Sequence, residues 1–155
     1  QDFGQEREWS EARELDWYLL SEPAHQQLQA YVKELLALYK KYPALYANDC
    51  NTDGFEWMNA DDCSRSIYSF VRKSPTGRNN LLFVINYTPV AREDYRVGVP
   101  KKKQYRLILN SKDPKFGGDV PVEQTVYKAE KQECDGKEFS FAYPLPAYGV
   151  AVFVY

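Results

Sequence analysis

The spacing of apolar residues changes once along the chain, near residue 54. Before that point, apolar side chains recur at three- and four-residue steps, which places them on one side of a helix. They are Leu28, Tyr31, Val32, Leu35, Leu38, Tyr39 and Tyr42. Ser21 in the capping position and Pro23 in the first turn precede this stretch, and Pro43 follows it. The pattern therefore predicts a helix of about five turns over residues 23–42.

After residue 54 the apolar period shortens to two, and aromatic and β-branched residues dominate, as is typical of strands. The predicted strands cover residues 55–58, 67–72, 81–87, 95–99, 104–110, 122–126, 139–143 and 150–154. Residues 74–80 and the Asp135-Gly136 pair read as turns between them. Short strands at about ten-residue spacing, with no helix between them, predict an antiparallel sandwich or barrel. The fold class is therefore mainly β with an N-terminal helical segment.

Charge and composition narrow the possible functions. The 20 basic and 22 acidic residues nearly cancel, and the single basic run, Lys101 to Lys103, is most simply a solvated turn. Nucleic-acid binding is therefore not expected. Aromatic residues make up 15% of the chain, more than a core of this size needs. The excess favours carbohydrate, because the C–H face of a sugar packs on an aromatic ring.

The cysteine and histidine residues do not form a set of metal ligands. Cys50, Cys63 and Cys134 contain no C-x-x-C pair, and His25 stands alone. We expect these thiols to be reduced, as in a cytoplasmic protein; the alternative is a Cys50–Cys63 disulfide that leaves Cys134 free. We expect no cofactor, because Gly117-Gly118 lacks the Lys-Ser/Thr partner of a phosphate loop. We expect no membrane span or signal peptide, and the patterned start at Gln1 suggests a fragment.

A series of short segments along the chain carries a resemblance to a known family. The segments are Asp2-Phe3-Gly4-Gln5, Arg7-Glu8-Trp9, Leu15-Asp16-Trp17, Tyr42-Pro43-Ala44-Leu45, Gly54-Phe55-Glu56-Trp57, Asn86-Tyr87-Thr88-Pro89-Val90, Tyr95-Arg96-Val97-Gly98-Val99-Pro100, Leu109-Asn110-Ser111, Gly117-Gly118 and Leu145-Pro146. In this order they resemble the C-terminal end of bacterial glycogen branching enzymes, which are 1,4-α-glucan transferases of the α-amylase clan. The likeness covers essentially the whole chain and departs from the usual pattern at Asp2, where Glu is usual, and at Tyr87, where Phe is common.

This resemblance implies two parts with different origins. Residues 1–47 correspond to the tail of a catalytic (β/α)₈ barrel, a loop plus the last barrel helix. Residues 48–155 correspond to the amylase-type C-terminal all-β sandwich. The missing catalytic barrel of the same enzyme is then the partner of this segment. The helix would dock on the sandwich or leave an apolar patch that drives self-association.

The resemblance also implies a reaction whose catalytic residues lie upstream of Gln1. The family cleaves an α-1,4 glucan through a carboxylate nucleophile and a carboxylic acid about 5–5.5 Å apart, and transfers the chain to a 6-hydroxyl. None of the acids in this chain falls in the matching motifs, so no catalytic residue is predicted. The acid pairs Glu11/Glu14, Asp61/Asp62 and Glu93/Asp94 are expected to be solvated charges.

Two tryptophans are the candidate glucan contacts. Trp57 lies at the junction of the helical segment and the β domain, and Trp9 follows the last barrel strand of the family pattern. Packing in the core or at an interface is the competing interpretation for Trp57. Because Phe55 and Trp57 share a strand face, we expect at least one of them to pack inward. Trp17, Tyr87, Tyr95 and Tyr105 are expected to be structural.

Three functions remain open from the sequence. The segment either stabilises a branching enzyme and supplies part of its glucan surface, or it is a self-sufficient starch- or glycogen-binding module. The third alternative is the tail of another α-amylase-clan enzyme, such as a debranching enzyme. α-Glucan, as glycogen or amylose, is the expected ligand in every case.

Overall fold

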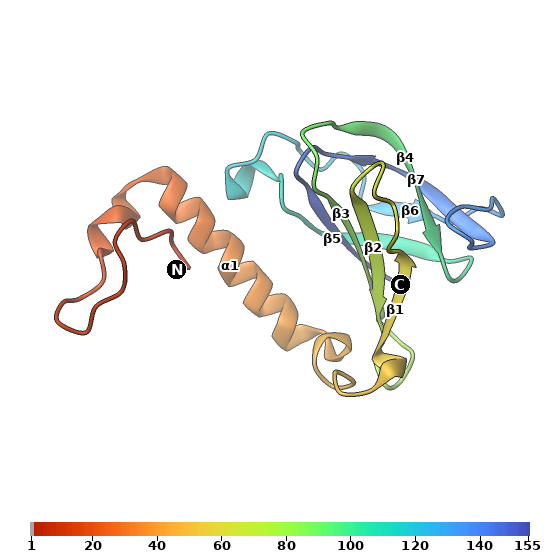
Figure 1. Ribbon diagram of the computed structural model, residues 1–155, viewed down its shortest axis with the longest axis horizontal. Helices are drawn as coiled ribbons and strands as arrows, with labels where there is room; N and C mark the ends of the chain where they lie inside the picture. Colours follow the sequence, from red (N-terminus) through yellow and green to blue (C-terminus); the bar gives the residue numbers. More distant parts are fainter. Residues whose placement is uncertain (1) are drawn as a thin grey trace.

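A computed structural model describes residues 2–155, in which a helical N-terminal segment precedes a β-sandwich (Figure 1). The strands lie to one side of the long helix α1, and the N-terminal loop lies at the end of α1 that is farthest from β1 (Figure 1). The elements are η1 Trp17–Ser21, α1 Pro23–Lys41, η2 Pro43–Leu45, η3 Thr52–Gly54, β1 Phe55–Asn59, β2 Ile67–Arg72, β3 Leu81–Asn86, β4 Arg92–Val99, β5 Gln104–Asn110, η4 Pro114–Phe116, β6 Val126–Lys128, β7 Phe139–Leu145 and β8 Val150–Val154.

The predicted antiparallel sandwich is confirmed. The larger sheet has the order β1-β2-β3-β8-β5-β6, and β4 pairs with β7 in the smaller sheet. Every recorded strand pair is antiparallel. The Asp135-Gly136 pair has positive φ at both residues, 51° and 69°, which suits a tight turn between antiparallel segments.

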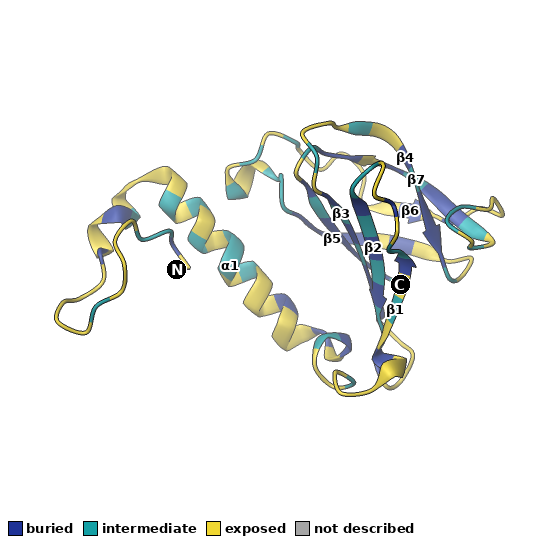
Figure 2. Cartoon of the chain, in the orientation of Figure 1, coloured by how far each residue is buried: buried dark blue, intermediate teal, exposed yellow. Residues whose placement is uncertain are grey.

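The main core lies between the two sheets. Alternate side chains of each strand point inward, so the ladder of Tyr105, Phe141 and Phe153 is almost fully excluded from solvent. Their rings contact one another with centroids 5.2 Å apart, both for Tyr105–Phe141 and for Phe141–Phe153. Figure 2 shows this burial as the dark blue of the strands. The β domain therefore closes a core from its own residues.

The predicted helix is confirmed as α1, but its capping residue is not Ser21. The capping position is Glu22, which makes no side-chain cap bond, while the Ser21 hydroxyl donates to the Tyr18 carbonyl at 2.8 Å in the preceding η1 turn. Pro23 occupies the first turn, and the Tyr42 amide closes the last turn on the Leu38 carbonyl at 3.0 Å. The chain then turns at Pro43, as the sequence predicts.

α1 packs against the outer face of the larger sheet through one narrow side. Leu38 and Tyr42 join a second apolar cluster with sheet residues that include Leu81 and Val152. Nearer the start of α1, Tyr31 contacts Phe116 of η4, with ring centroids 5.1 Å apart. Figure 2 shows that most of α1 is otherwise exposed or half-buried. The helix therefore both docks on the sandwich and leaves apolar surface open.

One predicted strand is displaced. Residues 122–125 form a loop, and the short strand β6 begins only at Val126. The ladder of β6 with β5 runs only from Gln104–Lys128 to Arg106–Val126, beyond which the Leu107 amide still donates to the Thr125 carbonyl at 2.8 Å. The Asn110 side chain instead donates to the Val120 carbonyl at 3.2 Å and holds the loop. The expected strand over residues 122–126 is therefore wrong.

Candidate functional site

An aromatic row, Phe55, Trp57, Phe70 and Phe83, crosses strands β1, β2 and β3 on the outer face of the larger sheet. The rings contact in sequence across the strands, with centroids 5.2 Å apart for Phe55–Phe70 and 4.8 Å for Phe70–Phe83. Trp57 meets the edges of Phe55 and Phe70 at 5.0 and 5.7 Å. Phe83 also packs against the apolar cluster that α1 covers, so the aromatic row begins at the edge of the area of the sheet that the helix covers.

Trp57 lies on the surface of this row and not in the core. It is 49% exposed and Phe55 is 37% exposed. The expectation that one of them packs inward is wrong, because both alternate with the inward positions of β1, where Met58 enters the core. The arrangement leaves a partly open aromatic surface, in which the Trp57 ring stands at 85° to Phe55 and 80° to Phe70. Such a surface can bind a sugar face or another protein surface.

Trp9 lies on a separate surface. It is 68% exposed, in the loop that precedes η1, at the end of α1 far from β1 (Figure 1). The buried Asp16 carboxylate fixes the base of this loop, because Arg7 Nε donates to it at 2.8 Å. The Gln5 side chain in turn accepts from the Asp16 amide at 3.0 Å. The structure therefore does not bring Trp9 and Trp57 together.

The aromatic residues expected to be structural divide into two groups. Tyr95 and Tyr105 are buried, as expected. Tyr87 is 62% exposed and meets Tyr68 at the edge of the outer face, so its expected place in the fold is wrong. Trp17 stacks on the buried Phe3 at 5.5 Å while half of its surface remains open.

The exposed side of α1 continues the apolar surface. Leu28, Leu35, Leu36 and Tyr39 are between 39% and 58% exposed. Leu28, Leu35 and Tyr39 belong to the predicted stripe together with the docked Leu38 and Tyr42. Leu36, which the predicted stripe does not include, adjoins them on the helix. A helix of this amphipathicity is normally covered along its whole apolar side. This face and the aromatic row are therefore candidate contact surfaces.

The acid pairs are not arranged as a catalytic site. Glu11, Glu14, Glu93 and Asp94 are exposed, as expected. Asp62 is not a solvated charge, because Ser64, Asn59 and the Arg65 amide donate to its carboxylate and the Arg65 guanidinium pairs with it. Burial would raise the pKa of Asp62, but these partners hold it below its ordinary value. Arg65 also reaches Asp135 at 3.4 Å, so this group ties two loops together.

Residues 2–155 hold no group of three or more metal-ligating side chains. His25 Nδ1 lies 2.7 Å from the Phe3 carbonyl, which gives this residue a local structural contact. The three cysteines are free; burial raises the pKa of the Cys134 thiol to about 11, and this thiol contacts the Arg96 carbonyl at 3.3 Å. Over the same residues, no helix has the length and apolar character to cross a membrane.

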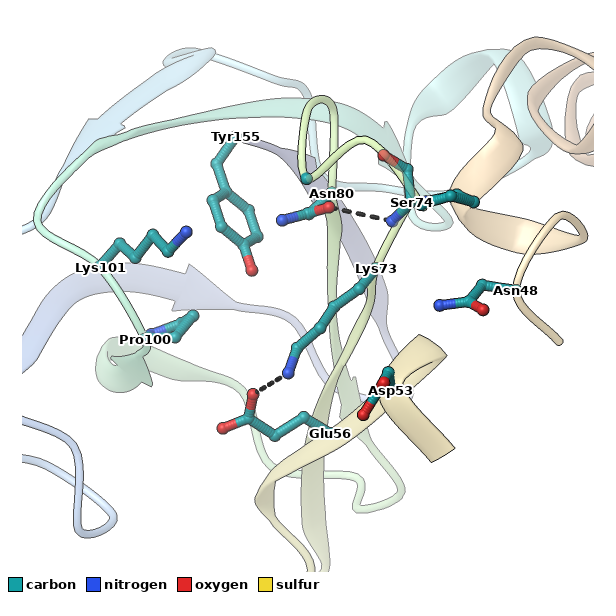
Figure 3. Close-up of a pocket in the computed structure, with 11 residues that line it drawn as sticks. Asn48, Asp53, Glu56, Lys73, Ser74, Asn80, Pro100, Lys101 and Tyr155 are labelled. Carbon is teal, nitrogen blue, oxygen red and sulfur yellow. Dashed lines mark hydrogen bonds and ion pairs between the residues drawn. The ribbon is translucent and has the colours of Figure 1, made fainter. Parts of the chain in front are cut away.

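A polar cleft opens at one end of the sandwich, and no sequence pattern predicts it (Figure 3). Its volume is about 500 Å³, and its walls come from the segment after α1, β1, the β2–β3 turn, the β4–β5 turn and the last residue. Residues from such distant segments share no spacing that sequence patterns could reveal. The polar side chains that converge there include Asn48, Glu56, Lys73, Asn80, Lys101 and Tyr155.

Comparison with known proteins places this geometry in a family. Residues 57–155 match the family described as the alpha amylase C-terminal all-beta domain. The chain belongs to this family. The match covers the sandwich from Trp57 onward, so the all-β domain predicted from the sequence is confirmed. Residues before Trp57, including α1, lie outside the matched region.

Longer relatives of this all-β domain extend the match to the helical segment. The chain is 50% identical over 155 residues to a 1,4-alpha-glucan branching enzyme of Butyrivibrio fibrisolvens, covering 100% of the chain and 24% of that enzyme. It is 42% identical to the branching enzyme of Cereibacter sphaeroides, over 94% of the chain and 20% of the relative. The corresponding enzyme of Aquifex aeolicus is 39% identical over 96% of the chain and 24% of its own length. The chain thus spans about a quarter of the length of these curated relatives.

Proposed function

We propose that the chain is the C-terminal part of a cytoplasmic 1,4-alpha-glucan branching enzyme. Such an enzyme cleaves an α-1,4 glucan and transfers the released chain to a 6-hydroxyl, which forms an α-1,6 branch in glycogen. The observation that carries this proposal is 50% identity along all 155 residues to a branching enzyme, helical segment included. A match confined to the sandwich would fit any enzyme that carries this all-β domain.

The helical segment and the sandwich have different roles in this proposal. Residues 1–47 end the catalytic barrel, with α1 as its last helix, and residues 48–155 form the C-terminal domain. The apolar side of α1 and the aromatic row then lie against the catalytic barrel of the same enzyme. Support comes from the half-open Leu28, Leu35, Leu36 and Tyr39, and from the three quarters of the relatives' length that precedes or surrounds this match.

Catalysis is assigned to the part of the enzyme outside this chain. A retaining mechanism needs two carboxyl groups about 5–5.5 Å apart in a site that also grips the sugar. The acids described above are exposed or, like Asp62, neutralised by an arginine. The chain therefore stabilises and shapes the enzyme and does not perform the transfer.

A chimera tests this proposal. The branching enzyme of Butyrivibrio fibrisolvens would have its matching quarter replaced by this chain, and branching would be followed by the fall in absorbance of the iodine–amylose complex. We expect activity from the chimera and none from the shortened enzyme or from the chain alone. A change in the iodine spectrum produced by residues 1–155 alone, or a folded but inactive chimera, contradicts the proposal.

Glucan binding by the chain itself is a second candidate function, favoured by the exposure of Trp57 and Trp9. Electrophoresis through glycogen-containing gels measures it directly. Retardation that is lost in Trp57→Ala or Trp9→Ala supports a sugar contact at that residue, because the substitution removes the indole on which the C–H face of the sugar packs. Trp17→Ala is the control, since Trp17 packs on Phe3. Unchanged mobility in glycogen assigns the aromatic row to contact with the rest of the enzyme.

A further inference from the structure

The polar cleft at the end of the sandwich contains a carboxylate fixed at its centre. Glu56 of β1 pairs with Lys73 Nζ at 2.5 Å (Figure 3). Lys137 Nζ donates to the other oxygen of Glu56 at 2.9 Å. Burial would raise the pKa of Glu56, but the two ammonium groups hold it below its ordinary value. Glu56 therefore presents a charged acceptor whose position is set by two different loops.

Around this carboxylate, the cleft offers an aromatic wall and amide groups. The Tyr155 ring packs on Tyr105 with centroids 4.7 Å apart, and its hydroxyl points toward the middle of the cleft (Figure 3). The Asn80 carbonyl oxygen accepts from the Ser74 amide at 3.0 Å, which fixes the orientation of the side chain. The backbone of Asn48 lies close against Gly54, the residue before β1, where a Cβ would come within 2.0 Å of the Asn48 carbonyl oxygen.

The balance of charge in the cleft disfavours an anion. The Lys73 ammonium in the lining and the Lys137 ammonium outside it are already paired with Glu56, so a phosphate entering the cleft would meet a carboxylate. Asp53 adds a second negative charge to the lining. Among the residues that the structure describes, the Lys101 ammonium alone of the lining cations has no carboxylate partner. One free cation beside two acids is a poor phosphate site.

A metal ion fits no better. Divalent cations need several oxygen ligands, and at Glu56 a cation would also meet the two ammonium groups that pair with this carboxylate. Each carboxylate oxygen keeps a second lone pair, so Glu56 can still accept from a neutral hydroxyl group. What remains is a mixture of fixed donors and acceptors beside an aromatic ring and the ring of Pro100. This combination matches a neutral polyol, whose hydroxyl groups both donate and accept and whose C–H face packs on a ring.

We infer that the polar cleft binds a neutral carbohydrate, an α-1,4-glucan chain, at a site separate from the aromatic row. The identity of the sugar rests on the proposed function, whereas the chemical class rests on the cleft. Glu56 and Trp57 are neighbours on β1, so their side chains point to opposite sides of the sheet. The cleft therefore stays open when the aromatic row is covered, and it can hold a glucan strand while the active site works on another part of the polymer.

Titration of the ¹⁵N-labelled 155-residue chain with maltoheptaose tests this inference by NMR. We expect saturable shifts of the Asn48 and Asn80 side-chain amides and of the Lys101 backbone amide, with a Kd on the order of 1 mM. The Trp57 indole signal reports on the other side of β1 within the same spectra. Cellohexaose, with β linkages, controls for linkage specificity, and inorganic phosphate is the probe for an anion site.

Matched variants locate the binding. Glu56→Gln removes the charged acceptor at nearly constant shape and should weaken maltoheptaose binding about tenfold, the loss that one charge-assisted hydrogen bond implies. Lys101→Ala should weaken it several-fold, while Lys102→Ala, one residue outside the lining, should leave it unchanged. Trp57→Ala should also leave the cleft signals and their affinity unchanged. Circular dichroism checks that each variant is folded.

Several results would overturn the inference. They are saturation without shifts at Asn48 and Asn80, equal effects of Lys101→Ala and Lys102→Ala, or phosphate binding in the cleft where maltoheptaose does not bind. Loss of all binding in Trp57→Ala assigns the sugar to the aromatic row instead. An inactive chimera combined with intact maltoheptaose shifts rejects the proposed function and keeps the cleft. An active chimera without shifts of the cleft signals rejects the cleft as a binding site and keeps the proposed function.

Discussion

The interior of the sandwich and the surface of α1 are built from equally apolar sequence but are covered very differently. Between the sheets, Tyr105, Phe141 and Phe153 are each at most 1% exposed. Along α1, Leu38 alone among residues 23–41 is buried. An isolated helix of this length gains most of its stability from packing, so its extra apolar side signals a surface made for a second contact. The sandwich is complete in itself, whereas α1 is half of an interface.

The largest effect should come from opening the interior. Phe153→Ala removes a ring that contacts three other aromatic side chains, and it should lower the free energy of unfolding by about 3–5 kcal/mol. Phe55→Ala is the matched control, because Phe55 is 37% exposed on the aromatic row and should cost about 1 kcal/mol. Urea denaturation followed by circular dichroism measures both. Equal losses would mean that the outer face contributes as much as the core.

The side of α1 that docks on the sheet should rank second. Leu38→Ala leaves a gap among Tyr42, Leu81 and their neighbours and should cost about 2–3 kcal/mol. Leu36→Ala, on the open side of the same helix at 58% exposure, should change stability by no more than about 0.5 kcal/mol. Thermal unfolding of the two variants compares the two sides of α1 directly. If both shift the midpoint equally, α1 is not docked as described.

The sequence predicted regular elements far better than it predicted surfaces. Strands β2, β5 and β8 were predicted with their observed bounds because alternation of inward and outward side chains is a local signal. The displaced strand at residues 122–126 failed because its pairing with β5 ends at Arg106–Val126, and local alternation does not report how far two strands pair. Local alternation likewise says that Phe55 and Trp57 share a face, but which face of β1 meets the second sheet is a tertiary property.

The candidate sites show the same limit. Trp57 and Trp9 are both exposed, as a sugar contact requires, and their contacts with glucan stay predictions. The polar cleft was not predicted, because Asn48, Glu56, Asn80 and Tyr155 meet only after both sheets have formed. The buried role of Asp62 was missed for a similar reason. Its partner Arg65 is three residues away, but its burial depends on the fold around both loops.

Asp62 gives a smaller and pH-dependent effect within the sandwich. Asp62→Asn removes the pairing with Arg65 and should cost about 1–2 kcal/mol at pH 7. Because the folded pKa lies below the unfolded value of about 4, the carboxylate stabilises the fold above that pH and loses this effect as the pH falls through the folded pKa. The gap between wild type and variant should therefore narrow as the pH falls below about 4 and through the lowered pKa of Asp62. Denaturation at several pH values measures it, with the exposed neighbour variant Asp61→Asn as control.

The smallest effect on stability should carry the clearest information about the open side of α1. Leu36→Lys places a charge on a side chain that already meets solvent, so the isolated chain should lose no more than about 0.5 kcal/mol. In the chimera with the Butyrivibrio fibrisolvens enzyme, the same charge would be buried against the catalytic barrel without a partner. The branching activity of the chimera, or the half-life of that activity on heating, should therefore fall at least tenfold. Lys33→Glu, on the polar side of the helix, should leave both properties unchanged. A fully active and stable Leu36→Lys chimera would mean that this side of α1 faces solvent in the whole enzyme. The helix, like the sandwich, would then need no further partner to cover it.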